Sequence, residues 1–384
     1  MTAVPEVSPI PVSSRPPLQM HWFLPTGGDS REVLPGEGSH TRAPDLAYLA
    51  QIAQACDALG FDGMLTPCGT GCEDAWITTA ALIPLTRRVK FLVAFRPTLL
   101  TPTLAAQMAS TYQRVSDGRL LINVVTGAEP AELARFGVWE DKDTRYERTG
   151  EFLHIMKSAW GPDPVDFDGS HYRVEGASTR LAPDPIPRIY FGGAPDAAER
   201  VAAEHVDVYL AWGEPPDLVA PRIERVRELA SAHGRTVTMG IRFHVITRPT
   251  SAEAWAAADA LLAGMSEDAI AEAQADFERT QSVGQARMAA LHGGDRSRLV
   301  VYPNVWAGIG LVRGGVGTAL VGSYEEVADR IGEYRDLGFD EFIFSGYPHL
   351  EAAYWFGEGV LPVLRERGLV PELDGGAAPV FSFR

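Results

Sequence analysis

The chain has 384 residues, of which 46% are hydrophobic, and a formal net charge of −16 at pH 7. The hydrophobic share is sufficient for a large core, whereas the acidic balance argues against binding of nucleic acid, whose phosphates are bound by clustered lysines and arginines. No apolar stretch approaches the roughly 18 residues that span a membrane, and three cysteines are too few for a disulfide framework. These features predict a cytoplasmic protein that binds neither nucleic acid nor membranes.

Strand patterns and helix patterns alternate along the chain. Short apolar runs typical of buried parallel strands occupy residues 20–25, 63–66, 90–96, 119–126, 188–192, 207–212, 239–246 and 341–345. Longer amphipathic runs occupy residues 44–59, 73–85, 103–115, 145–160, 196–205, 216–233, 252–265 and 324–337. Eight such units predict an α/β fold closed into a (β/α)8 TIM barrel. A doubly wound open sheet is the alternative, but no Gly-x-Gly-x-x-Gly follows an early strand.

The chain ends differ in composition from the repeating units. Residues 1–18 are rich in proline and serine, which predicts a disordered N-terminal arm. Residues 19–368 are expected to form a single barrel domain, and residues 369–384 a C-terminal tail. The sequence around Asp168-Gly169 predicts a small surface hairpin within that domain.

A long insertion, residues 266–317, separates the seventh unit from the eighth. Loops of this length in compact enzymes are usually lids or binding loops, so we expect a mobile lid here. A disordered linker is the alternative. Met288 and Trp306 favour the lid, because such side chains prefer burial.

Arg242 and His244 lie two residues apart on the strand predicted for residues 239–246. Residues at this spacing point to the same face of a strand, so a cation and a titratable imidazole share one surface. Their neighbours Ile241, Phe243 and Val245 face the other way. A strand with an apolar outer face and a polar inner face is typical of a barrel whose interior binds a ligand. The alternative is an edge strand whose polar face is exposed to solvent.

Other chemically useful residues follow the carboxyl ends of the strands, where TIM barrels place their active sites. They are Cys72, Asn123, Thr126, Gly192, Gly193, Trp212 and Tyr347. The glycine pair allows close approach of backbone N–H groups to an anion, which makes it a candidate phosphate cradle. Cys68 and Cys72 have the spacing of half a zinc site, but no second Cys/His pair follows, so no metal is predicted. Cys72 is also typical of a small buried residue, and Trp212 of a packing wall.

Eight ordered segments between about residues 20 and 365, together with parts of the insertion, resemble the bacterial luciferase-like flavin monooxygenases. Within that family the chain is similar to the two-component alkanesulfonate monooxygenases. The matching segments include Trp22-Phe23-Leu24-Pro25-Thr26, Cys72-Glu73-Asp74-Ala75-Trp76, Val125-Thr126-Gly127, Tyr190-Phe191-Gly192-Gly193, Trp212-Gly213-Glu214-Pro215-Pro216, Gly240-Ile241-Arg242-Phe243-His244-Val245-Ile246 and Ser345-Gly346-Tyr347-Pro348-His349-Leu350. In the insertion, Met288-Ala289-Ala290-Leu291-His292 and Leu311-Val312-Arg313-Gly314-Gly315 resemble the mobile lid of the family.

The resemblance implies an enzyme that takes reduced FMN from a separate NAD(P)H-dependent flavin reductase and uses O2 to cleave the C–S bond of an organosulfonate. The products would be sulfite and an aldehyde. By analogy, the protein would be a homo-oligomer, either a dimer or a tetramer.

The resemblance also implies roles for single residues. Catalytic roles fall on His244, which would assist proton transfer, and on Arg242, Arg296, Tyr347 and Cys72. Substrate-binding roles fall on Arg242, His244, Arg296, Trp212, Tyr347 and Gly27. FMN-binding roles fall on Tyr146, Asn123, Gly192, Gly193, Ala194 and Thr126. Arg313 is interpreted as a partner of a surface carboxylate and is left out of the site.

Departures from the family pattern are concentrated around the expected pocket. Gly27 replaces a histidine, Thr70-Gly71 replaces Arg-Ser, and Ala194-Pro195 replaces Ser-Ser. Smaller side chains at positions 27, 70 and 71 favour a bulky, polar sulfonate such as sulfoquinovose. A simple alkanesulfonate or methanesulfonate remains an alternative. So do a deazaflavin (F420)-dependent dehydrogenase and a barrel that binds flavin or sulfonate without turnover.

Overall fold

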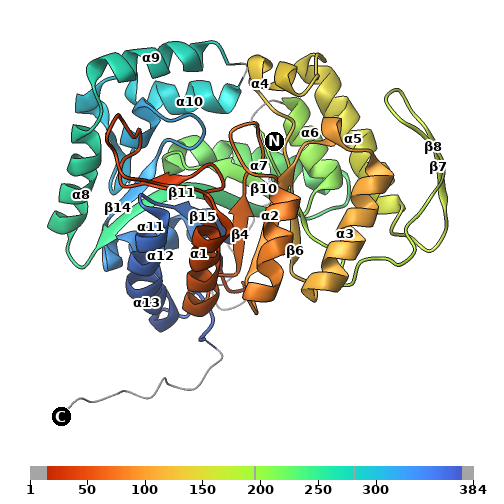
Figure 1. The fold of residues 1–384 in the computed structure, drawn as a ribbon, viewed down its shortest axis with the longest axis horizontal. Coiled ribbons are helices and arrows are strands. Elements are labelled where there is room, and N and C mark those ends of the chain that lie inside the picture. The colour runs from red at the N-terminus through yellow and green to blue at the C-terminus, as the bar shows by residue number, and fades with distance from the viewer. Residues whose placement is uncertain (1–14, 194–195, 281, 374–384) are drawn as a thin grey trace, which may run out of the picture.

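A computed structural model describes residues 15–193, 196–280 and 282–373. Eight parallel strands form a closed ring in the order β10-β9-β6-β5-β4-β1-β15-β11, and pairing of β10 with β11 closes it (Figure 1). The strands are β1 Gln19–Phe23, β4 Gly63–Thr66, β5 Lys90–Phe95, β6 Leu120–Val124, β9 Ile189–Gly192, β10 Val208–Trp212, β11 Thr238–Arg248 and β15 Glu341–Ser345. All eight predicted strands take part, so the predicted TIM barrel is confirmed.

Helices between the strands surround the ring. They are α1 Leu46–Leu59, α2 Ala75–Leu82, α3 Pro102–Ser116, α5 Lys142–Ser158, α6 Asp196–His205, α7 Pro216–Ala232, α8 Ser251–Ala263 and α11 Tyr324–Leu337. Local caps explain several boundaries: Asp45 caps the first N–H groups of α1, and Ser323 with Glu326 forms a capping box on α11. The sequence did not indicate the short helices α4 Pro130–Arg135, α12 His349–Trp355 and α13 Leu361–Glu366.

The core has an inner and an outer layer. Inside the barrel, apolar side chains from successive strands meet at Phe23, Leu65, Leu92, Leu121, Tyr190, Val208 and Ile343. Between strands and helices a larger cluster includes Ile241, Phe243 and Val245. On β11, Arg242 and His244 point into the barrel. The Arg242 guanidinium covers the Phe23 ring, and His244 is fully buried. The edge-strand alternative is therefore wrong.

The insertion after α8 is folded. It contains α9 Glu267–Glu278, α10 Val283–His292, β12 Val300–Tyr302 and β13 Val305–Trp306, and it leads into β14 Ala319–Ser323. β14 runs parallel to the second half of β11, with His244 opposite Ala319, and β13 pairs with it antiparallel. Trp306 is only 3% exposed within a separate apolar cluster, so the disordered-linker alternative is wrong. Figure 1 shows α9 and α10 along the upper left of the barrel.

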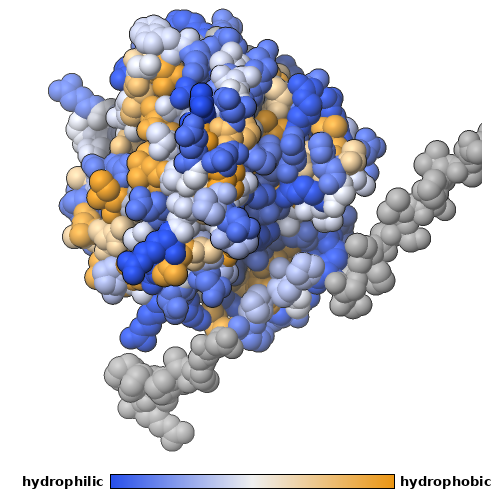
Figure 2. Space-filling model, turned by 90° about the vertical axis from the view of Figure 1, so that its right-hand side faces the viewer, coloured by the Kyte–Doolittle hydropathy of each residue, from blue (hydrophilic) through white to orange (hydrophobic). Residues whose placement is uncertain are grey.

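Smaller elements decorate the barrel. A two-stranded ribbon, β2 Asp29–Ser30 with β3 Thr41–Arg42, shapes the loop after β1. The hairpin predicted near Asp168 is present as β7 Val165–Asp168 and β8 Arg173–Ala177, and it projects at the right of Figure 1. Figure 2 shows hydrophobic residues interspersed among hydrophilic ones on that side. Single turns complete the elements: η2 Ile83–Leu85, η3 Pro97–Leu99, η4 Arg296–Arg298, η5 Gly308–Leu311 and η6 Phe356–Val360.

The two ends of the described chain meet. The backbone N–H of Leu18 donates to the carbonyl of Leu369 at 2.8 Å, and the Leu18 side chain is buried. Packing thus extends past the boundaries expected for the arm and the tail, whose residues 1–14 and 374–384 lie outside the described part. Within the described residues, no helix is both long and apolar enough to cross a membrane.

Candidate active site

Two cavities open where the strands of the barrel end. The first, of about 290 Å³, lies between the ends of β6, β9, β10 and β11, helix α5 and the start of α10. It brings together seven residues that the sequence singled out: Asn123, Thr126, Tyr146, Gly192, Gly193, Trp212 and Arg242. Ala194, predicted beside them, lies outside the described residues. The insertion contributes Ser282, Gly284 and Met288 to the same wall.

Glycines give the first cavity its space. A Cβ atom on Gly193 would lie 2.5 Å from the Cβ of Ala198 and 3.4 Å from the Tyr146 hydroxyl. A Cβ on Gly284 would lie 3.0 Å from the Trp212 ring. The backbone at these positions therefore passes closer to its neighbours than a side chain allows.

Two cations that the sequence did not single out, Lys142 and Arg145, line the same cavity. Both belong to the first turn of α5, and Tyr146 follows them directly. Burial lowers the pKa of Arg145, but a guanidinium stays charged in proteins. Together with the glycine pair, these groups form a positively charged end to an otherwise largely apolar cavity.

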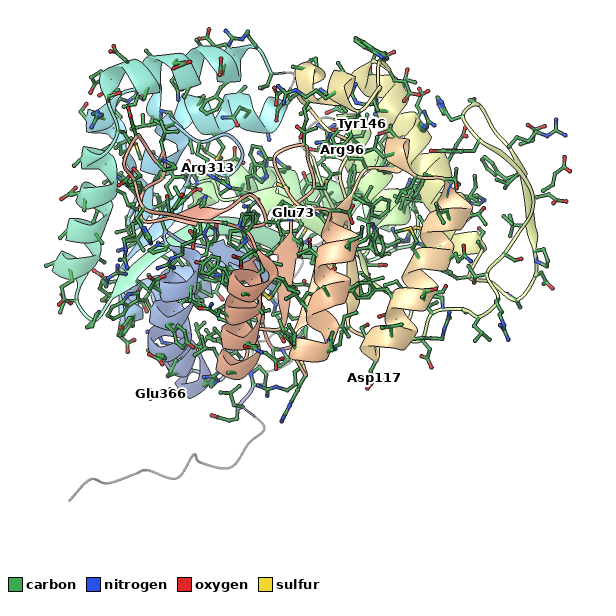
Figure 3. All side chains as sticks on the ribbon, in the orientation of Figure 1. Glu73, Arg96, Asp117, Tyr146, Arg313 and Glu366 are labelled. Carbon is green, nitrogen blue, oxygen red and sulfur yellow. The ribbon has the colours of Figure 1, made fainter. Side chains whose placement is uncertain are left out.

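The second cavity, of about 690 Å³, lies on the other side of the barrel mouth. The predicted residues Gly27, Cys72 and Tyr347 line it, together with a polar set that the sequence missed: Asp29, Glu32, Thr41, Arg42, Arg313 and His349. Figure 3 shows Arg313 and Tyr146 on opposite sides of this mouth, with Arg96 near Tyr146.

Arg242 lies between the two cavities. Its side chain lines the first, and its guanidinium carbon is 4.5 Å from the centre of the Phe23 ring, which lines the second. Burial, with a contribution from Arg313, lowers the pKa of Arg242 to about 9, so the group is still charged at neutral pH. None of the residues that the structure describes gives its Nε or Nη2 atom a hydrogen-bond partner. A buried cation without partners is costly, and an anionic ligand relieves that cost.

His244 is fully buried, and both of its ring nitrogens have partners. Nε2 lies 3.1 Å from the carbonyl of Val316 and must donate to it, so Nδ1 accepts from the Ser345 hydroxyl at 2.8 Å. The ring stacks on Tyr347 with 5.6 Å between centroids. Burial, and then Arg313, holds the pKa of His244 well below its usual range. This geometry favours a supporting role for the imidazole over the expected proton transfer.

The structure does not bring Arg296 to the site. Its Nε atom pairs with Glu267 at 2.6 Å and its Nη1 atom donates to the carbonyl of Leu262 at 3.2 Å, so it joins the end of α8 to the start of α9. Arg296 is not among the described residues that line either cavity, and its role in substrate binding stays a prediction.

The sequence interpretation set Arg313 aside, but the structure brings it to the site. It lines the second cavity, and its Nη1 atom lies 3.5 Å from Nε2 of His244. Its charge lowers the pKa values of both Arg242 and His244. The Arg-Gly-Gly run at the end of the insertion, just before β14, is the signal that pointed to it.

Cys72 and Gly27 meet at the rim of the second cavity. Burial raises the pKa of the Cys72 thiol, so it stays protonated at neutral pH and is a poor nucleophile. A Cβ on Gly27 would lie 2.9 Å from the carbonyl oxygen of Gly71 and 4.0 Å from the sulfur of Cys72. Position 27 therefore has little room for a side chain unless the neighbouring loop moves.

Asp29 and His349 form a buried pair that the sequence did not single out. The Asp29 carboxylate accepts from Nδ1 and from the backbone N–H of His349, both at 2.8 Å, and also from the Tyr48 hydroxyl. Burial opposes ionisation of Asp29, but the hydrogen bonds from His349 and Tyr48 outweigh it and lower its pKa. Burial also lowers the pKa of His349. The pair is thus a carboxylate beside a neutral imidazole.

The sequence model of the Luciferase-like monooxygenase family matches residues 18–341, which is most of the chain. The chain belongs to this family. The parts of the barrel that form both cavities lie within that span, except for the last loop, which carries Tyr347 and His349.

Solved structures agree on the fold. A riboflavin lyase with modified FMN and riboflavin matches with a TM-score of 0.78 and 23% identity, over 95% of this chain and 94% of that one. EDTA monooxygenase from Chelativorans sp. BNC1 matches with a TM-score of 0.72 and 20% identity, over 93% and 95%. A coenzyme F420-dependent tetrahydromethanopterin reductase from Methanopyrus kandleri matches with a TM-score of 0.65 and 16% identity, over 90% and 99%. At these identities the fold is what they share with the luciferase-like chain.

Proposed function

We propose that this luciferase-like monooxygenase uses reduced FMN and O2 to cleave the C–S bond of an organosulfonate, releasing sulfite and an aldehyde. The observation that carries the proposal is the position of two arginines, Arg242 and Arg313, where a glycine-lined cavity meets a larger polar one. Reduced FMN, delivered by a separate NAD(P)H-dependent reductase, supplies the electrons that activate O2. The riboflavin lyase structure contains a modified FMN, which supports a flavin on this fold.

The first cavity fits FMN. Gly192 and Gly193 let the backbone approach a phosphate closely, and the Tyr146 hydroxyl and the Lys142 and Arg145 cations stand at the same end. Cations and free N–H groups are the usual partners of phosphate oxygens. The remaining walls are mostly apolar, as a planar ring system requires.

A sulfonate is a permanent anion, so an acidic protein needs local cations to bind it. Arg242 has two nitrogen atoms without partners, and Arg313 adds a second charge from the insertion. Each charge-assisted hydrogen bond contributes about 1.5–3 kcal/mol. The insertion reaches both cavities, through Met288 and Arg313, so it excludes water from flavin and substrate together.

The shape of the second cavity supports a bulky hydroxylated substrate. Its volume of about 690 Å³ and its polar lining exceed the needs of a short alkyl chain. Gly27 leaves the rim without a side chain, and Asp29, Glu32 and Thr41 offer oxygen acceptors for hydroxyl groups. Sulfoquinovose combines a sulfonate with a sugar ring and is the substrate that we propose.

The test is sulfite release under air with FMN, NADH and a generic flavin reductase, comparing sulfoquinovose with methanesulfonate and octanesulfonate. We expect sulfite from sulfoquinovose, and none when oxygen is removed. Preference for an alkyl chain would make the protein an alkanesulfonate monooxygenase. Absence of sulfite from every sulfonate, with hydride transfer to a deazaflavin, would overturn the proposal.

A further inference from the structure

Within the described part of the chain, one ring nitrogen of His349 has no hydrogen-bond partner. The residue is only 4% exposed, and the unpartnered atom is Nε2. The ring lines the second cavity, with its centroid 5.6 Å from that of Phe23 and 5.5 Å from that of Tyr347. Buried polar atoms are nearly always paired, so an unpaired one facing a cavity indicates a ligand group.

The hydrogen bonds of Asp29 decide what Nε2 can do. An ionised carboxylate only accepts, so Nδ1 of His349 carries the proton of the neutral ring and Nε2 carries a lone pair. Asp29 also accepts from the backbone N–H of His349, the first residue of α12, so backbone and ring are held by the same carboxylate. The ligand group opposite Nε2 must therefore be a donor, such as a hydroxyl.

Burial lowers the pKa of His349 and keeps the ring neutral, and the charges around it act in both directions. Arg313, from the insertion, and Arg242, from β11, both disfavour a second positive charge, while Asp29, from β2, favours it. Tyr347, from the same loop, is protonated because burial raises its pKa. A neutral imidazole held by a carboxylate is the arrangement of a general base. His244 lacks this property, because both its nitrogens are paired.

We propose that His349 is the general base that removes the hydroxyl proton of the α-hydroxysulfonate formed on oxygenation, and that Asp29 is its positioning residue. This inference rests on the proposed function and names a step within it. The O–H bond breaks, and its proton goes to Nε2 while its electron pair forms the C=O bond of the aldehyde. The C–S bond breaks, and its electron pair leaves with sulfur as sulfite. The proton then passes from Nε2 to sulfite, so the step needs no oxidant.

Arg313 lies where this step develops negative charge. It lines the same cavity as His349, and a sulfonate that leaves as sulfite gains a second negative charge. A cation already in position stabilises that charge without reorganisation. The two residues would therefore act on either side of the breaking C–S bond. His349 takes the proton from the hydroxyl on carbon, and Arg313 stabilises the leaving sulfite.

The step can be tested apart from flavin chemistry, because an aldehyde–bisulfite adduct is itself an α-hydroxysulfonate. The full chain, with and without oxidised FMN, is mixed with the bisulfite adduct of glyceraldehyde, and sulfite release is followed. We expect the wild type to accelerate release and His349→Asn to lose at least about 100-fold of that acceleration, the usual contribution of a general base. Asparagine keeps a donor for Asp29, so the fold is preserved, and the exposed His233→Asn is the matched control.

Binding separates the catalytic role from a structural one. We expect His349→Asn to bind sulfoquinovose, measured by calorimetry, within about fivefold of the wild type, because a neutral hydrogen bond is lost but the arginines remain. Asp29→Asn should lower kcat for adduct collapse at least about tenfold with little change in KM, as expected for a residue that orients a base.

Three results would contradict the proposal. Equal acceleration by wild type and His349→Asn would show that another group takes the proton. Sulfite from sulfoquinovose under air without any acceleration of adduct collapse would overturn the inference and leave the proposed function standing. Absence of sulfite from every sulfonate under air would remove the proposed function and, with it, the substrate of this step.

Discussion

The two cavities at the barrel mouth satisfy their polar groups in different ways. In the first, glycines, a tyrosine and the start of α5 come from successive units of the barrel, and close backbone approach dominates. In the second, charged side chains from the first unit and from the insertion meet an imidazole of the last unit, one nitrogen of which has no partner among the described residues. The difference agrees with the proposed division of roles, in which the first cavity holds the flavin and the second binds and cleaves the sulfonate.

Arg242 lines the first cavity and covers the Phe23 ring of the second, so its removal should have the largest effect. We expect Arg242→Met to weaken sulfoquinovose binding about 100-fold, because charge-assisted hydrogen bonds from its unpaired nitrogens are worth about 3 kcal/mol. The same change should not lower Tm, since an apolar side chain replaces an unpaired buried charge. Calorimetry and thermal unfolding measure the two effects. Arg248→Met, on the same strand with its guanidinium over Trp355, is the control; unchanged binding by Arg242→Met would contradict the anchoring role.

Gly193 tests whether the first cavity alone holds FMN. A Cβ at this position meets Ala198 at 2.5 Å, so Gly193→Val should weaken FMN binding, measured by fluorescence quenching, at least about tenfold. Sulfoquinovose binding without flavin should stay nearly unchanged. Gly332→Ala, whose Cβ meets nothing within 4 Å, is the control. Equal loss of both ligands would mean that the two cavities are not separate sites.

Gly27 tests the size of the second cavity. Gly27→His restores the side chain common in the resembling enzymes, but its Cβ meets the carbonyl of Gly71 at 2.9 Å, so the rim must close inward or shift. We expect the ratio of kcat/KM for sulfoquinovose to that for methanesulfonate to fall about fivefold, which corresponds to about 1 kcal/mol. Gly332→Ala, on α11 and outside the lining of both cavities, is the control. An unchanged ratio would show that position 27 does not set specificity.

His244 should make the free energy of unfolding depend on pH. An unfolded histidine has a pKa of about 6.5, whereas burial holds the pKa of His244 well below that. As the pH falls below about 6.5, the unfolded state binds the proton first, so the unfolding free energy drops by up to about 1.4 kcal/mol per pH unit until the folded-state pKa is reached.

In His244→Asn, residue 244 does not titrate, so it causes no such fall in the unfolding free energy. The wild type should therefore be more stable at neutral pH, and its advantage in urea unfolding should shrink between pH 7 and about pH 5.5. His349 titrates in both proteins and cancels. A constant difference across this range would mean that His244 is not held neutral in the folded protein.

Local patterns in the sequence determined the barrel. Side chains alternate along a strand and recur with helical period along a helix, so the eight strands and their helices could be read from neighbouring residues alone. The same alternation placed Arg242 and His244 inside the barrel, and the position of glycines after a strand indicated the cradle at Gly192 and Gly193. Such features depend on residues close in sequence. The structure confirms the barrel and places both glycines in the wall of the first cavity, and their role as a phosphate cradle stays a prediction.

Tertiary structure alone decided which polar groups meet. Asp29 and His349 are 320 positions apart and touch because β1 pairs with β15 as the ring closes. Arg296 and Arg313 lie in one insertion, yet in the described structure Arg296 contacts Glu267 and the end of α8, whereas Arg313 lines the second cavity. A polar side chain takes whichever partner the folded chain presents nearest to it. That choice depends on closure of the ring and the path of the insertion, which no local pattern encodes.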